Sequence, residues 1–419
     1  MKRGLFLAVT VILVCMFTTS ILGAPEPVKL RIYTQYSILD EKLAYDYAAA
    51  AMKKIMPEVT LDLEVAAQDD DQKIKTYAAT GNLPDIFFSS PGLIEVFKKS
   101  KNVLLLDEYV RELKVEERLL PSARSLLWDE DGHCYGVPNV GQWAAVIYYN
   151  KEVFSVNNIK VPTNYDEFLA AVKALKAKEI IPLALFAKEK WPGVQLYDIL
   201  VTRMDPGGLK KINDGKGSIA EPAYRKAAER LVELVKAGLV SSGAFNTNYD
   251  EACALFIEGK AAMLLNGAWA MSLFGEQMGN KVDLLYYPLA DSANAEAVKW
   301  NMSGGGLNQA FCVSPHSKHK DVAARFACQF ALKFAEGRVV KCGDPNPILK
   351  NCPPPEKGYL PIQQRYVNDS VNFKTMTCFP WGLTDARFKT AIEDNVQKLL
   401  TGEYAVNDFI KDTERALAR

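Results

Sequence analysis

Trp269 lies between a predicted strand and a predicted helix, at a position where its side chain can contact a ligand. It closes the stretch "YDEACALFIEGKAAMLLNGAW". Asn248, directly before this stretch, and Glu251 form a capping-box-like helix start, and Gly259 ends that helix. The short apolar run 261–265 is typical of a buried strand, and a second helix is expected directly after the tryptophan. Open α/β sheets bind ligands at the carboxyl ends of their strands. We therefore interpret Trp269 as a ligand contact rather than a core residue.

The sequence lacks the common catalytic motifs. It contains no G-x-S-x-G nucleophile turn, no phosphate-binding P-loop and no H-E-x-x-H zinc motif. His316 and His319 give H-x-x-H, but the chain has only 3 histidines, and exposed loop residues before a helix explain this pair. The acidic runs 69–71 and 129–131 lack EF-hand spacing, and a helix start and a hairpin tip explain them. We expect no catalytic residue, no metal ion and no cofactor.

The cysteines leave two readings open. Seven of the 8 follow residue 24, so at least one is unpaired within a monomer. They form no C-x-x-C pair, which argues against a zinc site. Cys342 and Cys352 flank a proline-rich loop and are the best pair for a disulfide in an oxidising compartment. Buried free thiols are the alternative.

The amino terminus resembles an export signal. Residues 1–24 have a basic start, an apolar core and a small-residue end, as in a secretory signal peptide cleaved near Gly23 or Ala24. Cys15 is a possible lipid attachment site, although Val14 precedes it where lipoprotein signals carry a small residue. No later apolar run is long enough to span a bilayer. We expect a periplasmic or extracellular, cell-surface-associated protein.

Length and charge narrow the class of protein further. A chain of 419 residues is too long for one compact core, so two lobes are expected. It carries 50 basic and 50 acidic residues. This balance gives no basic surface for a nucleic acid and no field to attract an anionic substrate.

The elements expected near the amino terminus alternate between strand and helix. "VKLRIYT", "VTLDLEV" and "DIFFSS" are strand-like, and amphipathic helical segments separate them. Alternation of this kind predicts a mainly parallel sheet. "WDEDGHCYGVP" predicts a hairpin built on Asp131-Gly132, with the strand "WAAVIYYN" running out of it. The whole pattern fits two α/β lobes of similar size with a cleft between them.

Five stretches then occur in order along the chain. They are "ATGNLPDIFFSS" (79–90), "GHCYGVPNVGQWAAVIYYNKEVF" (132–154), "PTNYDEFLAAVKALK" (162–176), "LFIEGKAAMLLNGAW" (255–269) and "SGGGLNQAFCVSPHSKHKDVAARFACQFA" (303–331). Together they resemble the extracellular solute-binding proteins of ABC importers, specifically the sugar-binding family that includes maltose-binding protein. No single stretch identifies the ligand.

The resemblance implies an architecture and a set of partners. It implies an α/β fold of two lobes, each a mainly parallel sheet flanked by helices, with the chain crossing between them more than once. Lobe one would comprise residues 28–142 plus 296–342, and lobe two residues 143–295 plus 343–419. A sugar would bind in the cleft, the lobes would close by a hinge motion, and the closed monomer would dock on the transmembrane subunits of a permease.

The chemistry of a sugar suits the residues on offer. Aromatic rings can cover the apolar C–H faces of a pyranose while polar groups pair with its hydroxyls. The resemblance puts Trp143, Trp269 and Trp381 beside the cleft, and Trp191 less directly. The expected contacts to hydroxyls are Gln35, Ser37, Ser89, Ser90, Gln142, Gly304, Gly305 and Gly306. For each of these an ordinary turn or cap is the alternative. Trp128, Trp300 and Asp85 are interpreted as structural.

One departure from the family pattern leaves the ligand open. Maltose-binding protein carries a carboxylate at the position of Trp143, whereas an indole can only stack or donate one N–H. The ligand or its orientation should therefore differ. A polyamine or a phosphodiester is an alternative ligand, and a secreted glycoside hydrolase with two acting carboxylates is an alternative function. The mostly neutral and aromatic positions favour a neutral polyol.

Overall fold

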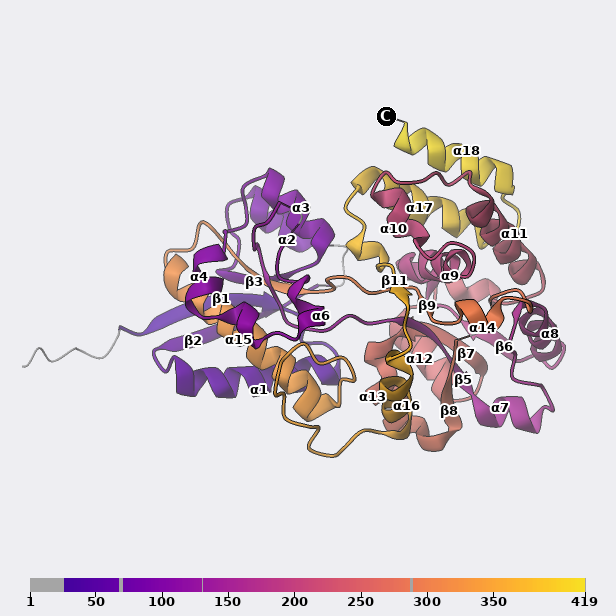
Figure 1. Ribbon diagram of the computed structural model, residues 1–419, viewed down its shortest axis with the longest axis horizontal. Coiled ribbons are helices and arrows are strands. Elements are labelled where there is room, and N and C mark those ends of the chain that lie inside the picture. Colours follow the sequence, from indigo (N-terminus) through magenta and orange to yellow (C-terminus); the bar gives the residue numbers. More distant parts are fainter. Residues whose placement is uncertain (1–25, 68–70, 130, 287–288, 419) are drawn as a thin grey trace, which may run out of the picture.

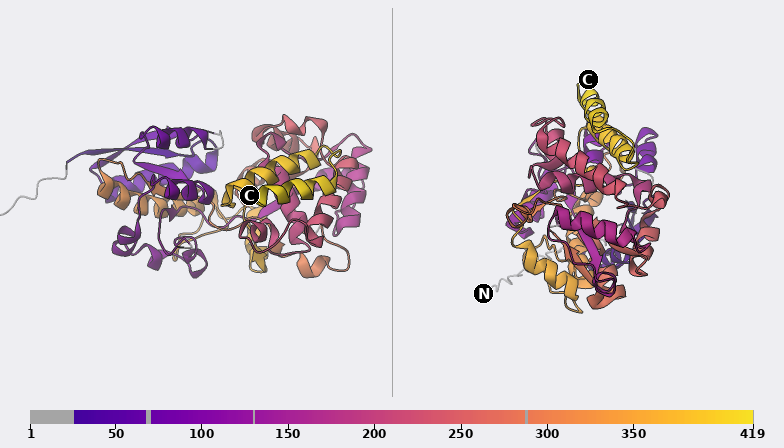
Figure 2. Two further views of the ribbon diagram at one scale, coloured as in Figure 1. Left: turned by 90° about the horizontal axis from the view of Figure 1, so that it is seen from above. Right: turned by 90° about the vertical axis from the view of Figure 1, so that its right-hand side faces the viewer.

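The computed structural model describes residues 26–67, 71–129, 131–286 and 289–418. The expected signal segment 1–24, with Cys15, lies outside these ranges. The helices and strands form two lobes that lie side by side in Figure 1 and in the left view of Figure 2. Lobe one is the part built on a five-stranded sheet, and lobe two is the part built on a four-stranded sheet. The two-lobed α/β fold expected from the sequence is confirmed.

The sheet of lobe one has the strand order β2–β1–β3–β10–β4. Its strands are β1 (Val28–Thr34), β2 (Val59–Val65), β3 (Ile86–Ser89), β4 (Val137–Pro138) and β10 (Ala310–Val313). β1 runs parallel to β2 and β3, whereas β10 runs antiparallel to β3 and β4. Alternate residues of β1 face opposite sides. Leu30 and Ile32 therefore join one buried cluster, and Tyr33 joins another.

Helices cover both faces of this sheet. They are α1 (Leu39–Ile55), α2 (Gln72–Ala79), α3 (Pro91–Lys99), α4 (Asp107–Glu112), α5 (Val115–Arg118), α6 (Pro121–Arg124) and α15 (Lys320–Cys342). α1 and α15 pack together on the face of Leu30 and Ile32. α2 and α3 bury Ile74 and Phe97 on the face of Tyr33 (Figure 1). The long helix α15 follows β10, so a late segment of the chain completes the first lobe.

The sheet of lobe two has the order β6–β7–β5–β8. Its strands are β5 (Ala145–Asn150), β6 (Ile181–Ala184), β7 (Ala261–Gly267) and β8 (Val282–Leu285). Every residue of β5 and β7 is buried, which explains why their sequences are apolar except for an asparagine near the end of each strand. A separate two-stranded sheet joins β9 (Asn301–Met302) to β11 (Thr375–Met376) in parallel.

Most of the helices belong to lobe two. They are α7 (Lys151–Val156), α8 (Tyr165–Lys176), α9 (Trp191–Thr202), α10 (Gly208–Asn213), α11 (Pro222–Lys236), α12 (Tyr249–Ile257), α13 (Met271–Met278), α14 (Ala295–Val298), α16 (Pro361–Ser370), α17 (Ala386–Leu399) and α18 (Val406–Leu417). Short 3₁₀ turns are η1 (Ala187–Glu189), η2 (Ser242–Phe245), η3 (Ala268–Ala270), η4 (Gly279–Lys281) and η5 (Pro380–Gly382). The capping box expected at α12 is confirmed, because Asn248 and Glu251 each accept the other's backbone N–H at 2.9 Å. None of the helices in the described ranges is long and apolar enough to cross a membrane.

Two expectations about strands need correction. The sheets are mixed rather than mainly parallel, because β10 and β5 run antiparallel to the strands beside them. The hairpin expected at Asp131-Gly132 is wrong as well. Gly132 does close a tight turn by donating its N–H to the Asp129 carbonyl at 2.9 Å. However, β4 pairs with β10, and β5 lies in the other sheet. A turn signal therefore fixed the local bend but not the partner of the strand that follows it.

The segments that pass between the lobes lie next to one another. The Ala145 N–H donates to the Ser303 carbonyl at 2.8 Å, and the Asn308 side chain donates to the Gly141 carbonyl at 2.9 Å. A further passage follows α15, where the Leu120 N–H of lobe one donates to the Ile348 carbonyl at 2.8 Å. The lobe boundaries expected from the sequence stay a prediction.

Candidate functional site

The four tryptophans expected to contact a ligand lie together, although distant segments supply them. Trp143 precedes β5, Trp191 begins α9, Trp269 lies in η3 after β7, and Trp381 lies in η5. The Trp269 ring is central. Its centroid is 5.1 Å from that of Trp143, 6.0 Å from that of Trp191 and 5.9 Å from that of Trp381. The fold therefore brings the whole predicted aromatic set to one place.

A fifth ring, which sequence reasoning missed, completes this group. Phe379 stacks on Trp381 with the centroids 4.5 Å apart and the planes 3° apart. It also lies 5.1 Å from Trp269 and 6.1 Å from Trp191. The signal was present in "CFPWG", where Phe379 precedes a tryptophan already singled out. We call these five residues the aromatic cluster: Trp143, Trp191, Trp269, Phe379 and Trp381.

Local backbone explains the position of the Trp269 ring. The strand β7 ends at Gly267, and the indole of Trp269 folds back over that glycine. A Cβ at position 267 would lie 1.8 Å from the indole ring, so no larger residue fits there. The buried hydroxyl of Tyr249 also interacts with the indole, and burial raises the pKa of that tyrosine. Trp269 is half-buried, and its orientation follows from the residues around it.

Trp191 is oriented by its neighbours in the same way. Its indole Nε1 donates to the Glu189 carboxylate at 3.1 Å. Lys190, directly before it, has a φ of 55°, which few residues other than glycine adopt. Pro192 at the first turn then starts α9 with a fixed φ. This tight entry turns the Trp191 ring toward Trp269 and Trp381 rather than along the helix.

Trp143 has a polar partner that the sequence did not suggest. The residue is only 6% exposed, and its indole Nε1 donates to Asp344 Oδ2 at 3.5 Å. The guanidinium of Arg338 lies over the same ring, 5.5 Å from its centroid. Position 143 holds a tryptophan where the family pattern described above has a carboxylate. The Asp344 carboxylate, 201 residues away in the sequence, lies against this tryptophan.

The polar residues expected to contact sugar hydroxyls mostly have local partners. Ser90 is the N-cap of α3 and accepts the Leu93 N–H at 3.4 Å. Ser89 is buried and donates to the Ser90 carbonyl at 3.2 Å. Ser37 uses its backbone N–H to bind the Glu41 carboxylate at 2.7 Å. Gln35 accepts a hydrogen bond from the Gln309 side chain. Their role toward a ligand stays a prediction.

The glycine turn is unusual in its backbone conformation. Gly304, Gly305 and Gly306 have φ values of 87°, 104° and 70°, which make three consecutive residues in the region that favours glycine. The Gly304 N–H donates to the Thr377 hydroxyl at 3.1 Å, and the Gly306 N–H donates to the Gln142 side chain at 3.3 Å. These hydrogen bonds bring the turn and Gln142 together within the protein, while a ligand contact at either stays a prediction.

The residues interpreted as structural have partners away from the aromatic cluster. Asp85 accepts the Arg31 N–H at 2.8 Å and the Ser317 hydroxyl at 2.6 Å, which orients the turn before β3. Trp128 donates to Glu116 at 3.2 Å. Trp300 packs against Tyr286 with the centroids 5.0 Å apart.

Of the two readings that the sequence left open for Cys342 and Cys352, the disulfide is not formed. All seven cysteines after residue 24 are free thiols, and all except Cys352 are buried. The Cys342 thiol instead lies 3.5 Å from the Asp40 carbonyl, in hydrogen-bonding contact. Burial raises the pKa of both thiols, to about 12 for Cys342 and to about 11 for Cys352. The alternative of buried free thiols is thus what the structure shows.

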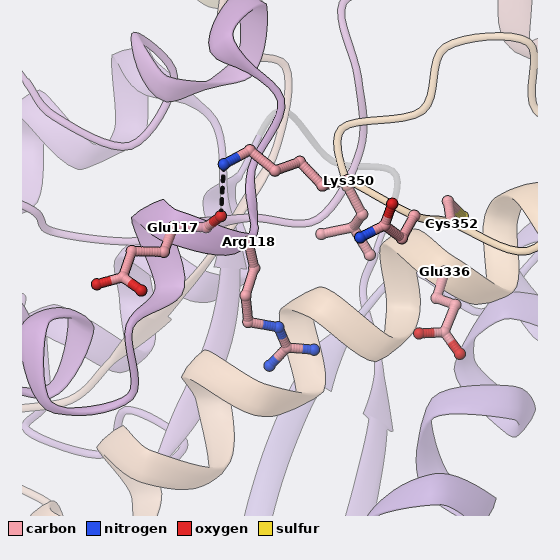
Figure 3. A pocket seen from close by; sticks show the side chains of 7 residues that line it. Glu117, Arg118, Glu336, Lys350 and Cys352 are labelled. Carbon is pink, nitrogen blue, oxygen red and sulfur yellow. Dashed lines mark hydrogen bonds between the residues drawn. The ribbon is translucent and has the colours of Figure 1, made fainter.

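Lobe one has a separate cavity of about 300 Å³ that does not include the aromatic cluster (Figure 3). Its lining residues are Glu117, Arg118, Glu336, Leu349, Lys350, Asn351 and Cys352. The ammonium group of Lys350 donates a hydrogen bond to the Glu117 carbonyl at 2.8 Å, as Figure 3 shows. No aromatic ring lines this cavity. This cavity thus differs in chemistry from the aromatic cluster, which is the candidate site for a sugar-like ligand.

Comparison with known proteins identifies the family of the chain. Residues 40–334 match the family model described as bacterial extracellular solute-binding protein. An extracellular-binding protein of an ABC transporter from Pyrococcus horikoshii is 25% identical over 83% of this chain and 77% of its own length. A multiple sugar-binding protein of Streptococcus mutans is 25% identical over 66% of this chain and 67% of its own length.

A solved structure covers nearly the whole chain. It comes from work on xylan utilisation by the thermophile Caldanaerobius polysaccharolyticus and superposes with a TM-score of 0.82 and 28% sequence identity. The match covers 93% of this chain and 99% of that chain. The similarity therefore spans both lobes and the segments that connect them.

Proposed function

Because the chain belongs to the family of bacterial extracellular solute-binding proteins, we propose that its aromatic cluster binds a carbohydrate for an ABC importer. The family expected from the sequence motifs is confirmed by the match over residues 40–334. The Streptococcus relative is a multiple sugar-binding protein, and the superposed structure comes from work on xylan utilisation; both support a sugar as the ligand. A mono- or oligosaccharide is the proposed ligand class.

The convergence of five aromatic rings carries this proposal. Trp191, Trp269 and Trp381 are half-buried, so part of each ring is open to a ligand, and their centroids lie 5.2–6.0 Å apart. Rings of this kind present flat apolar surface, and an indole also offers an N–H. A neutral sugar with C–H faces matches such a surface better than a polyamine or a phosphodiester, which would need acids or arginines to balance its charge.

The lobes are proposed to close on the ligand about the glycine turn. Arg203, directly after α9, donates to the carbonyls of Val298, Lys299 and Asn301, which supports placing this segment with lobe two. Asp198 of the same helix is buried and accepts the Ser303 hydroxyl. The three glycines with positive φ follow directly, and lobe one begins beyond them at β10. A rigid anchor followed by permissive residues is suited to a hinge.

We also propose that the protein acts outside the cytoplasmic membrane and has a permease as its partner. Membership of an extracellular family supports a position outside the cytoplasmic membrane, with residues 1–24 as the export signal and Cys15 as an alternative lipid anchor. The closed monomer would deliver its sugar to the transmembrane subunits of a permease. We propose binding without chemical turnover, because family members are binding proteins.

A ligand screen followed by product analysis tests this function. The protein, without its export signal, is melted in the presence of galactose, laminaribiose, stachyose, xylotriose or chitotriose, with spermidine and glycerophosphocholine as charged comparisons. A sugar at 100 times its Kd should stabilise the folded state by about 2.7 kcal/mol, and chromatography should recover it intact. Stabilisation by a charged compound alone, or cleavage of the sugar, would overturn the proposal.

A further inference from the structure

At the carboxyl end of α15 the chain turns, so that the Asp344 carboxylate contacts Arg338 of the same helix. Gly343 adopts a left-handed conformation with φ of 65°, and its N–H donates to the Val339 carbonyl at 2.9 Å. The 5→1 bond from the left-handed Gly343 is that of an αL motif, and the Asp344 N–H adds a hydrogen bond to the Arg338 carbonyl at 3.0 Å. The Asp344 side chain then meets the Arg338 guanidinium, with Nε and Oδ2 3.1 Å apart. Both side chains are almost wholly buried, 5% and 2% exposed.

This buried ion pair encloses one member of the aromatic cluster. Asp344 Oδ2 accepts the hydrogen bond from Trp143 Nε1, and Arg338 covers the face of the same indole. The other Asp344 oxygen accepts the Asn346 N–H at 3.0 Å, which fixes the carboxylate in turn. An edge contact and a face contact together leave the Trp143 ring little freedom to rotate. Trp143 then contacts Trp269, the central ring of the cluster, with the centroids 5.1 Å apart.

The same helix end is also where the lobes touch. The Cys342 carbonyl at the end of α15 accepts hydrogen bonds from Ser272 of α13 and Gln363 of α16, both at 2.9 Å. Asp40 of α1 lies 3.8 Å from Arg338, on the lobe-one side of this contact. α13 and α16 belong to lobe two (Figure 1). The ion pair therefore lies between the contact of the lobes and the aromatic cluster.

We propose that Asp344 and Arg338 are positioning residues for ligand binding, which hold the Trp143 indole in the orientation that the cluster needs and tie it to the contact between the lobes. This inference rests on the proposed carbohydrate function but adds residues that touch no ligand. Stability alone does not require the pair, because buried ion pairs are often replaceable by apolar residues without loss. Their defined geometry around one indole is what an apolar replacement could not supply.

The test compares two carboxylate-to-amide variants. Asp344→Asn removes the charge that orients Trp143 and Arg338. Asp291→Asn is the matched control, because Asp291 likewise pairs with a buried arginine, Arg230, whose guanidinium lies 4.4 Å from the centroid of Tyr165. Near-ultraviolet circular dichroism of the indole bands reports the Trp143–Trp269 arrangement without any sugar. Fluorescence titration with the sugars of the screen reports affinity.

The proposal predicts that only Asp344→Asn changes the indole dichroism. It also predicts that this variant binds sugar about tenfold more weakly, as expected for loss of a hydrogen bond to a charged group. Unchanged dichroism in folded Asp344→Asn protein would overturn the proposal, whether or not any sugar binds. Changed dichroism with no sugar bound even by the parent protein would instead count against the carbohydrate function.

A second variant keeps the test decisive if Asp344→Asn does not fold. Trp143→Phe retains an aromatic ring but cannot donate to Asp344. Its sugar affinity should fall by about the same tenfold, because the loss acts through the indole N–H. Parent-like affinity in the folded Trp143→Phe protein would refute a positioning role for Asp344 and Arg338.

Discussion

The aromatic cluster and the three serines expected to contact a ligand in lobe one behave in opposite ways. Trp143, Trp191, Trp269 and Trp381 come from four distant segments and still contact one another. Ser37, Ser89 and Ser90 of lobe one instead make hydrogen bonds to residues within four positions in the sequence. The rings depend on the tertiary fold for their position, whereas the serines depend mainly on their own turns.

The difference has a simple physical cause. A large aromatic ring has no local group that can cover it, so its burial requires a surface built by other segments. A serine hydroxyl finds a satisfactory partner in the nearest unpaired backbone group, as at a helix N-terminus. We therefore expect substitutions in the cluster to change ligand affinity and substitutions of the serines to change stability. Four predictions test this contrast, starting with the largest expected effect.

Replacing Trp269 by alanine should weaken sugar binding most. The change removes the central ring of the cluster, and truncation of an aromatic anchor typically costs about 2 kcal/mol or more, roughly thirtyfold in affinity. Calorimetric titration with the sugar found by screening measures this. Trp128→Ala is the matched control, because Trp128 is also half-buried but contacts Glu116 outside the cluster. A stacking role for Trp269 is wrong if Trp269→Ala keeps parent affinity or if its ligand-free melting temperature collapses.

Gly305→Ala should destabilise the protein more than an alanine at an open glycine. Gly305 has a φ of 104°, and a Cβ there would lie 2.8 Å from the Met376 Cβ. A left-handed alanine costs about 1–2 kcal/mol before any clash is counted. Gly215→Ala isolates the backbone cost, because Gly215 has a φ of 68° and nothing within 4 Å of its Cβ position. Denaturant unfolding measures both, and equal losses would show that close packing at the turn contributes nothing.

Ser90→Ala should lower stability by about 1 kcal/mol and leave sugar affinity unchanged. The hydroxyl accepts the Leu93 N–H, and loss of an N-cap has this typical cost. Ser90→Asn should recover most of the stability, because asparagine caps equally well. If Ser90→Ala instead weakens sugar binding while the melting temperature stays the same, the hydroxyl contacts the ligand as first expected from the sequence.

The smallest expected effect is a pH dependence from Asp40. Burial raises the pKa of this carboxyl, although Arg338 opposes the shift; Ser272, Asp344 and Glu276 also face it. Because the folded pKa is the higher one, the contribution to stability is complete below about pH 4 and is lost as the pH rises above that value. Asp40→Asn mimics the protonated form. The parent protein should therefore lose stability relative to Asp40→Asn between pH 4 and pH 7, and a constant difference across this range would contradict the shift.

The sequence predicted the local elements better than their pairing. The capped start of α12, the buried strand β7 and the position of Trp269 after it all follow from patterns within a few residues. The antiparallel direction of β5 and β10 does not, because it depends on how the chain returns between the lobes. The hairpin at Asp131-Gly132 failed for the same reason: a turn specifies a bend, not the distant strand that pairs with β4.

The site shows the same limit. Its tryptophans could be recognised from their residue type and their positions at strand or helix ends. The Asp344 carboxylate could not, because it lies 201 residues from Trp143 in the sequence and reaches it only through the end of α15. The sequence left the pairing of Cys342 and Cys352 open, because spacing around a loop does not report the direction in which Cys342 points, which is toward Asp40.

The most direct test of sugar binding by the aromatic cluster is a crystal structure of the protein with the sugar found by screening. We expect a pyranose ring to lie against the open faces of Trp269 and Trp381, between the two lobes, with Trp143 held by Asp344 behind them. Sugar density in the cavity beside Cys352, or at any site that touches none of the five aromatic rings, would contradict it.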